Sequence, residues 1–104
     1  MKNQTNEQAT YRLVYSAYNG TGNCGSIINH YGSLDAALDD VYPLDDQLFN
    51  KSADYLGLAL LIDNGKITKE YTLARQEWDK EKGEWGKEEK FDFDYDSPDQ
   101  EYES

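Results

Sequence analysis

The sequence has little of several features that would point to a familiar class of protein. Its single cysteine, Cys24, excludes an intramolecular disulfide framework and is typical of a reducing compartment. Ten basic residues against 21 acidic ones leave a formal charge of −11, which excludes a cationic surface for nucleic-acid phosphates. No apolar run approaches the roughly 18 residues of a membrane-spanning helix, and the charged start lacks the apolar region of a signal peptide. These absences predict a cytoplasmic protein that binds neither membranes nor nucleic acid directly.

Residues for catalysis or cofactor binding are equally scarce. The single histidine, His30, and Cys24 have no third residue that would complete a nucleophilic triad. Residues 20–25 carry three glycines in the dinucleotide-binding pattern. That pattern needs a helix directly after the loop, and Gly32 and Ser33 interrupt the chain before any helix begins. The sequence therefore predicts no cofactor and no enzymatic activity.

Acidic residues near the C-terminus have the spacing of a calcium-binding loop, with Asp92, Asp94, Asp96 and Glu103 in ligand positions. Ser97 stands where that loop needs glycine for its sharp turn, and the chain ends before an exiting helix. A calcium-sensor loop is excluded, and we expect no metal site.

What the chain does contain predicts one small folded domain. Its 104 residues suit a single domain, and 13% aromatic residues are too many for a typical disordered chain. Residues 1–9 are polar and unpatterned, which predicts a flexible leader. We expect the domain to span residues 10–96 and residues 97–104 to form an acidic tail.

The pattern of apolar residues predicts an antiparallel sheet. Asn64 and Gly65 give a strong hairpin signal, because both central positions of a type I′ turn need positive φ. The almost continuously apolar segment 55–62 predicts a buried central strand. Strands are expected over residues 10–18, 55–62, 66–78 and 84–95, with a turn over 79–83.

One helix is expected between the first two of these strands. After a flexible glycine-rich loop over 20–25 and a short strand-like piece over 26–31, Ser33 is a good N-cap for a helix over 34–42. Apolar residues recur at helical spacing, and Pro43 ends the run. The expected fold class is therefore α+β, with about four strands and one main helix in the order β-α-β-β-β.

The excess negative charge is concentrated in two blocks. Residues 34–54 have a net charge of −5 and residues 91–104 a net charge of −6, while the charges elsewhere cancel. Such focusing favours a directed electrostatic surface. The alternative is that acidic segments only keep a small protein in solution.

The placement of the acids also favours a binding role. If residues 91–96 form a strand, their three aspartates lie on one face at intervals of about 6.6–6.8 Å, which is comparable to successive phosphates on a nucleic-acid strand. On the expected helix, Asp35 and Asp39 form a repulsive i,i+4 pair, and Asp39 and Asp40 lie at the end that disfavours anions. A sequence selected only for stability would avoid this arrangement.

The first third of the chain resembles a known family. Residues 11–19, with the sequence Tyr-Arg-Leu-Val-Tyr-Ser-Ala-Tyr-Asn, are followed by Asn23-Cys24-Gly25-Ser26-Ile27, Tyr31 and Leu34. This order is similar to the opening of ArdA-type antirestriction proteins. The resemblance implies an acidic DNA mimic that blocks restriction-modification enzymes.

Together these observations predict a small acidic inhibitor, phage- or plasmid-encoded, that blocks a host nucleic-acid-binding defence enzyme. The partner is a restriction enzyme or a CRISPR effector, blocked by nucleic-acid mimicry or by steric occlusion of its basic groove. An immunity protein or antitoxin that neutralises a cognate toxin, such as a basic nuclease, fits the same charge pattern, and a structural module with an acidic tail is a third alternative. The predicted partner-binding residues are the acids Asp35, Asp39, Asp40, Asp45, Asp46, Asp92, Asp94 and Asp96, with Tyr42 and Tyr95 as aromatic anchors.

Overall fold

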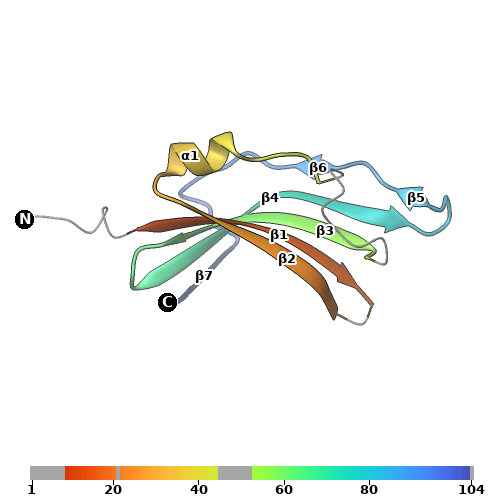
Figure 1. The fold of residues 1–104 in the computed structure, drawn as a ribbon, viewed down its shortest axis with the longest axis horizontal. Coiled ribbons are helices and arrows are strands. Elements are labelled where there is room, and N and C mark those ends of the chain that lie inside the picture. The colour runs from red at the N-terminus through yellow and green to blue at the C-terminus, as the bar shows by residue number, and fades with distance from the viewer. Residues whose placement is uncertain (1–8, 21, 45–52, 104) are drawn as a thin grey trace, which may run out of the picture.

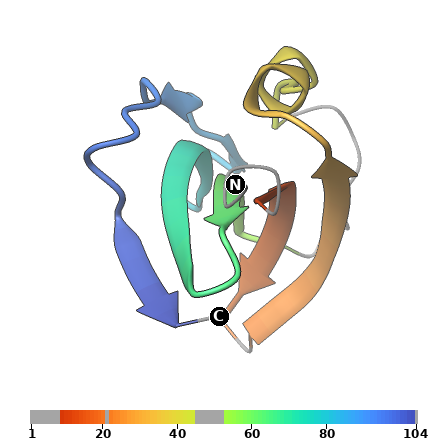
Figure 2. The ribbon, with the colours of Figure 1, turned by 90° about the vertical axis from the view of Figure 1, so that its left-hand side faces the viewer.

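Four long strands dominate the computed structural model, which describes residues 9–20, 22–44 and 53–103 (Figure 1). They are β1 (Thr10–Asn19), β2 (Gly22–Tyr31), β3 (Tyr55–Asp63) and β4 (Ile67–Asp79). All pairings are antiparallel, and the order across the sheet is β2-β1-β3-β4. The sheet curls into an open trough (Figure 2). The α+β prediction with a main helix is therefore wrong, because the described chain is mostly β-sheet with one short helix.

The largest difference from the expected fold is β2. We predicted a flexible loop over 20–25 and a short strand-like piece, but β1 and β2 form a hairpin paired from Asn19–Gly22 to Tyr11–Tyr31. Gly22 has a φ of 130°, a conformation that residues with a Cβ rarely adopt. Gly22 therefore allows the chain to turn tightly after β1 and to begin β2 at once, where the sequence suggested a flexible loop.

The helix α1 (Leu34–Asp39) has six residues and is shorter than predicted. Its N-cap is confirmed, since the Ser33 side chain accepts a hydrogen bond from the Ala36 N–H at 3.2 Å. The helix was expected to continue to residue 42. Instead the Tyr42 N–H donates to the Tyr15 hydroxyl on β1 at 2.8 Å, so a tertiary contact takes over from the helical hydrogen bonds.

The β3–β4 hairpin is confirmed, with a longer turn than predicted. The paired residues Asp63 and Thr68 leave four residues between them, and Gly65 has a φ of 93°. The Asn64 side chain accepts hydrogen bonds from the N–H groups of Lys66 and Ile67, each at 2.9 Å. β3 is central, as expected, but its burial alternates along the strand, so only one of its faces is fully buried.

Three short strands cover the free edge of β4, where we predicted one long strand over 84–95. They are β5 (Glu84–Trp85), β6 (Glu89–Lys90) and β7 (Gln100–Glu103), which pair with successive parts of β4. One cause of the break is Gly86, whose N–H donates to the Glu77 carbonyl at 2.8 Å. A Cβ at this position would lie 3.1 Å from the same carbonyl oxygen. Residues 91–99 contain no strand, and β7 falls in the segment predicted to be a tail.

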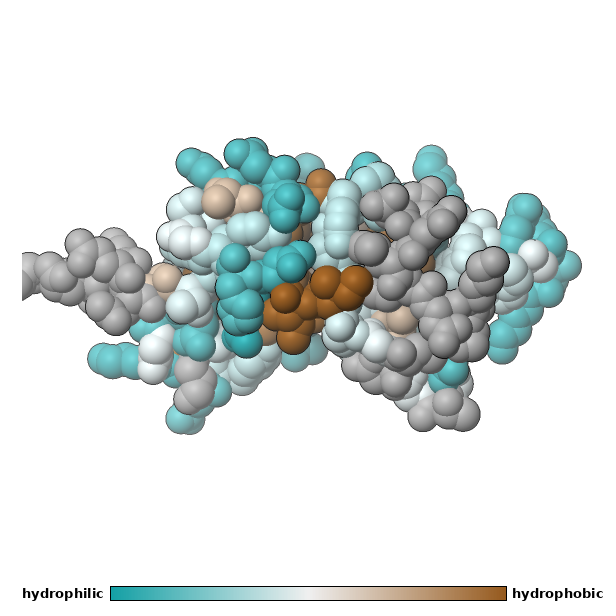
Figure 3. Space-filling model, viewed as in Figure 1, coloured by the Kyte–Doolittle hydropathy of each residue, from teal (hydrophilic) through white to brown (hydrophobic). Residues whose placement is uncertain are grey.

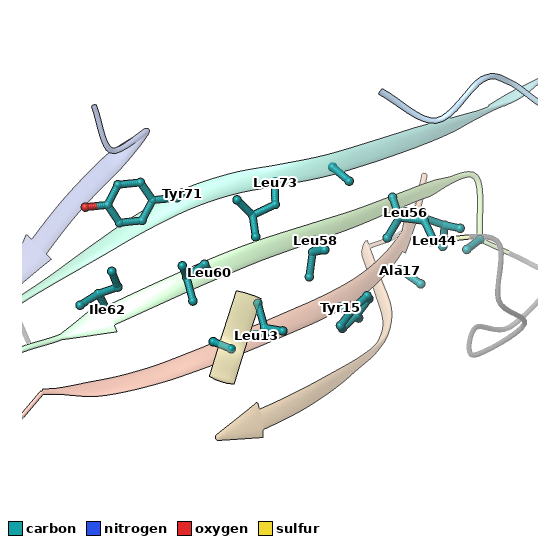
Figure 4. Close-up of a cluster of buried hydrophobic side chains, with 13 residues drawn as sticks. Leu13, Tyr15, Ala17, Leu44, Leu56, Leu58, Leu60, Ile62, Tyr71 and Leu73 are labelled. Atoms are coloured by element: carbon teal, nitrogen blue, oxygen red, sulfur yellow. The ribbon is translucent and has the colours of Figure 1, made fainter. Parts of the chain in front are cut away.

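The hydrophobic core lies on the face of the sheet that α1 covers, here called the inner face. Leu13 and Tyr15 on β1, Leu58 and Leu60 on β3 and Tyr71 on β4 are almost inaccessible to solvent (Figure 4). Ala37 is the buried residue of α1. No helix in the part of the chain that the structure describes is long and apolar enough to cross a membrane.

The core tyrosines predict a loss of stability at alkaline pH. Burial raises the pKa of Tyr15 and of Tyr71 from 10.0 to about 12. Because the folded-state pKa is raised, this contribution to stability is complete below pH 10 and disappears as the pH rises towards 12. Each group contributes on the order of 2 kcal/mol. Thermal unfolding scans should therefore show a melting temperature that falls over this interval, and a constant melting temperature up to pH 12 would contradict the assignment.

Candidate functional site

The candidate site is built on residues 91–99, here called the acidic arch, which run alongside β4 between β6 and β7. At one end the Phe91 N–H donates to the Leu73 carbonyl at 2.9 Å. At the other end the Asp99 N–H donates to the Glu70 carbonyl at 2.8 Å, and the Asp99 carboxylate accepts the Thr72 N–H at 2.6 Å. The Asp99 carboxylate thus takes the place of the main-chain carbonyl that a neighbouring strand would offer to the Thr72 N–H. The edge of β4 is therefore hydrogen-bonded here although the arch is not a strand.

Aromatic residues fix the middle of the arch to the core. The Phe93 ring packs edge-on against Tyr71 with 4.8 Å between the ring centroids, and the Tyr95 ring lies 6.2 Å from Tyr71. The Tyr71 hydroxyl donates to the Tyr95 carbonyl at 2.7 Å. After burial, the nearby Tyr95 and the acids Glu101, Asp96 and Asp94 also raise the pKa of Tyr71. Tyr71 therefore connects the core directly to the charged surface.

Between the arch and β4 lies an open hollow of about 250 Å³. Its wall combines carboxylates with aromatic rings, and its lining residues are Tyr71, Thr72, Arg75, Phe91, Asp92, Asp94, Ser97 and Asp99. The Arg75 guanidinium lies 5.3 Å from the centroid of the Phe91 ring, and its Nε is 2.7 Å from a carboxylate oxygen of Glu89. This pairing with Glu89 raises the pKa of Arg75.

The arch is a negative surface whose carboxylates form no ion pair among the described residues, although Lys69 Nζ lies 4.5 Å from the centroid of the Tyr95 ring. It contains four aspartates and no basic residue. The ion pair found among the described residues joins Arg75 to Glu89, which is outside the arch. No Lys, Arg or His nitrogen of the described residues lies within 4.0 Å of an arch carboxylate. Asp92, Asp94 and Asp96 are exposed, and Tyr95 is 48% exposed. Carboxylates beside exposed rings suit a cationic side chain of a binding partner, through charge and cation–π contacts.

The helix carries a second acidic group of residues. Asp35, Asp39 and Asp40 are exposed on α1 and at its C-cap. The Tyr31 hydroxyl donates a hydrogen bond to the Asp40 carboxylate. Burial, followed by this hydrogen bond and the charge of Asp40, raises the pKa of Tyr31 to about 12.

The structure separates these two acidic groups. The helix packs on β1 and β2, whereas the arch lies along β4 at the other side of the trough (Figure 2). The aspartates of the helix and those of the arch therefore form two separate surfaces. The expected row of aspartates at strand spacing does not form, because residues 91–96 are not a strand.

Three other predicted residues have separate outcomes. Tyr42 is half-buried, with its ring packed edge-on against Tyr15 at 4.2 Å between centroids, so it belongs partly to the core. Asp45 and Asp46 lie outside the described residues. From the sequence we expected Asp99 only as part of an acidic tail. No local signal identifies its contact with Thr72, because that contact depends on the pairing of β7 with β4.

The described residues contain no group of three His, Cys, Asp or Glu side chains arranged to hold a metal ion. The chain matches none of the protein-family models, curated proteins or solved structures with which it was compared. The resemblance of its first third to ArdA-type proteins therefore stays a prediction.

Proposed function

We propose that the protein is a small acidic inhibitor that acts in the cytoplasm by binding the basic groove of a nucleic-acid-binding defence enzyme. The observation that carries this proposal is the acidic arch, with four aspartates, no compensating cation within 4.0 Å among the described residues and an aromatic-lined hollow beneath. Grooves that bind nucleic acid are rich in Lys and Arg, which are the side chains that such a surface attracts.

The mechanism is occupation of the groove. The charge of −11 steers the inhibitor toward a positive surface and increases the association rate. A lysine or arginine of the partner enters the hollow, where it meets Asp92 and Asp94 next to Arg75, which already lies against the Phe91 ring. The bound inhibitor then excludes nucleic acid sterically. Phosphate-like spacing of the aspartates is not part of this mechanism, because the arch forms no strand and turns at residues 95 and 96.

The first test identifies the partner. The tagged protein is used to capture proteins from host lysate at about 0.1 M and about 1 M salt, at which the Debye length is about 10 Å and about 3 Å. We expect one nucleic-acid-binding enzyme at low salt, released by added duplex DNA or RNA. Recovery of a single toxin would replace the proposal with the immunity function, and recovery of no specific protein would contradict both.

The second test asks whether the arch is the binding surface. Changing Asp92, Asp94 and Asp96 to asparagine should weaken binding of the captured enzyme by about 3-fold to 150-fold, since each of the three exposed charge contacts contributes about 0.2–1 kcal/mol. The Asp94 side chain accepts a hydrogen bond from the Asp96 N–H, and asparagine at position 94 keeps a side-chain oxygen that can accept it. Calorimetric titration measures the change in affinity.

The control for this test changes Asp35, Asp39 and Asp40 to asparagine. It removes the same amount of charge from α1, which lies on the other side of the trough. If the arch is the site, the helix variant should bind almost as tightly as the wild type. Equal weakening by both triple variants would show that only net charge matters.

A further inference from the structure

The two exposed rings of the arch already carry cations that belong to the chain itself. The Lys69 Nζ lies 4.5 Å from the centroid of the Tyr95 ring, and the Arg75 Cζ lies 5.3 Å from the centroid of the Phe91 ring. Both cations come from β4, along which the arch runs. Tyr95 is 48% exposed and Phe91 is 40% exposed. The rings of the arch are therefore positions at the protein surface where a cation binds.

The two cations are held differently. The Arg75 Nε also lies 2.7 Å from a carboxylate oxygen of Glu89, so two contacts fix this guanidinium. Lys69 makes no ion pair among the described residues, although Glu101 lies opposite it in the pairing of β4 with β7. Within the part of the chain that the structure describes, the partner of the Lys69 ammonium is the Tyr95 ring. A single exposed contact of this kind is weak, so another cation can replace Lys69 there.

Carboxylates surround the Tyr95 ring. Asp94 and Asp96 precede and follow Tyr95 in the chain, and both are exposed. After burial and Tyr95 itself, the charges of Glu101, Asp96 and Asp94 raise the pKa of Tyr71, whose hydroxyl donates to the Tyr95 carbonyl. These acids therefore lie close enough to act on the same small region. A cation that reaches the ring from outside gains the attraction of the ring and of the neighbouring carboxylates.

We infer that the Tyr95 ring is a second cation subsite of the binding surface, and that Lys69 occupies it until a lysine or arginine of the partner displaces it. This subsite rests on the proposed function, since the cation that fills it comes from the basic groove. The first subsite is the hollow, where Asp92 and Asp94 lie next to Arg75. Lys69 covers the ring in the free protein and therefore competes with the partner.

The apolar surface of the molecule does not offer a cation the same contacts. On the outer face of the sheet, opposite α1, Ile28 on β2 is 50% exposed and lies beside Val14 on β1 in the pairing register. Figure 3 shows a hydrophobic patch over β2. The ten residues of β2 include no Asp or Glu, so a lysine or arginine meets no carboxylate of that strand. A ring with carboxylates beside it suits the partner's cation better than this patch.

Proton NMR of the wild-type protein tests which group occupies the ring. A tyrosine ring shields protons that lie over its face, so we expect the ε-methylene signal of Lys69 upfield of that of Lys80. Lys80 is the reference because it is exposed in the turn beyond the end of β4. Tyr95→Leu should abolish the difference. Equal Lys69 and Lys80 signals in the wild type would overturn the inference.

Titration with an acetylated and amidated tetra-lysine peptide at low ionic strength tests the displacement. We expect the Lys69 signal to move toward that of Lys80 as the peptide binds, together with changes in the amide signals of Asp92 and Asp94. Changes in those amide signals while Lys69 stays on the ring would contradict the second subsite and leave the proposed function standing. No change at the arch would count against both.

Charge-matched variants measure the competition. Lys69→Gln removes the ammonium from the ring, whereas Lys80→Gln removes the same charge from the turn after β4. Lys69→Gln should bind the peptide about 2-fold to 5-fold more tightly than Lys80→Gln, as expected for release of one exposed cation–π contact. In a Tyr95→Leu background this advantage should largely disappear, because no ring is left to release. The same advantage with and without the Tyr95 ring would show that charge alone acts, and would overturn the inference.

Discussion

Tyr71→Ala is expected to lower the free energy of unfolding by about 3–5 kcal/mol, the usual cost of removing a buried aromatic ring. The Tyr71 side chain is only 2% exposed, and its ring contacts Phe93 and lies beside Tyr95. Its hydroxyl also holds the Tyr95 carbonyl of the arch. Against a typical total stability of 5–15 kcal/mol, this loss leaves a marginal protein. Chemical denaturation in urea measures it.

Two matched variants separate the contributions of Tyr71. Tyr71→Phe removes only the hydroxyl and should cost about 1 kcal/mol, with loss of order in the arch. Tyr102→Ala removes a ring of the same size from β7, where it is 42% exposed, and should cost much less than Tyr71→Ala. If Tyr71→Ala and Tyr102→Ala were equally costly, Tyr71 would not have the anchoring role assigned to it.

Leu60→Ala is expected to destabilise the protein by about 2–5 kcal/mol, because Leu60 is fully buried in the middle of β3 and alanine leaves a cavity. The adjacent Leu61 provides the control. It has the same side chain on the same strand but lies half-buried on the outer face. Leu61→Ala should therefore cost less than half as much in the same urea titration.

The comparison of these two leucines also tests the assignment of the faces. A cost for Leu61→Ala as large as that for Leu60→Ala would mean that something covers the outer face as completely as the inner one. A smaller cost agrees with a sheet that has one buried face and one open face, which is the face that continues to Ile28 at the β2 edge.

Local patterns in the sequence were sufficient wherever the determining interactions are local. Alternation predicted β1, and Asn64 with Gly65 predicted the β3–β4 hairpin, because a turn depends on a few neighbouring residues. Ser33 predicted the start of α1, because an N-cap bonds within its own first turn. Such patterns failed at residues 20–25, where the same glycines suit a loop or a strand and only pairing with β1 decides between them.

The candidate site was partly predictable for the same reason. The concentration of aspartates and aromatic rings in residues 91–99 is visible in the composition, and the predicted binding residues Asp92, Asp94, Tyr95 and Asp96 all lie in the segment that forms the arch. The shape of that segment is not local. Asp99 reaches Thr72, and Tyr71 bonds to Tyr95, across 27 and 24 positions of the chain.

By itself, then, the sequence determined the charge of −11, its concentration in two blocks and the strands and turns that depend on near neighbours. Only the tertiary structure decided which face of β3 is buried, that β2 is a full strand at an edge, and that the acidic C-terminal segment arches over β4. The physical reason is that pairing and burial depend on residues distant in the chain, whereas charge and turn geometry are carried by the residues themselves.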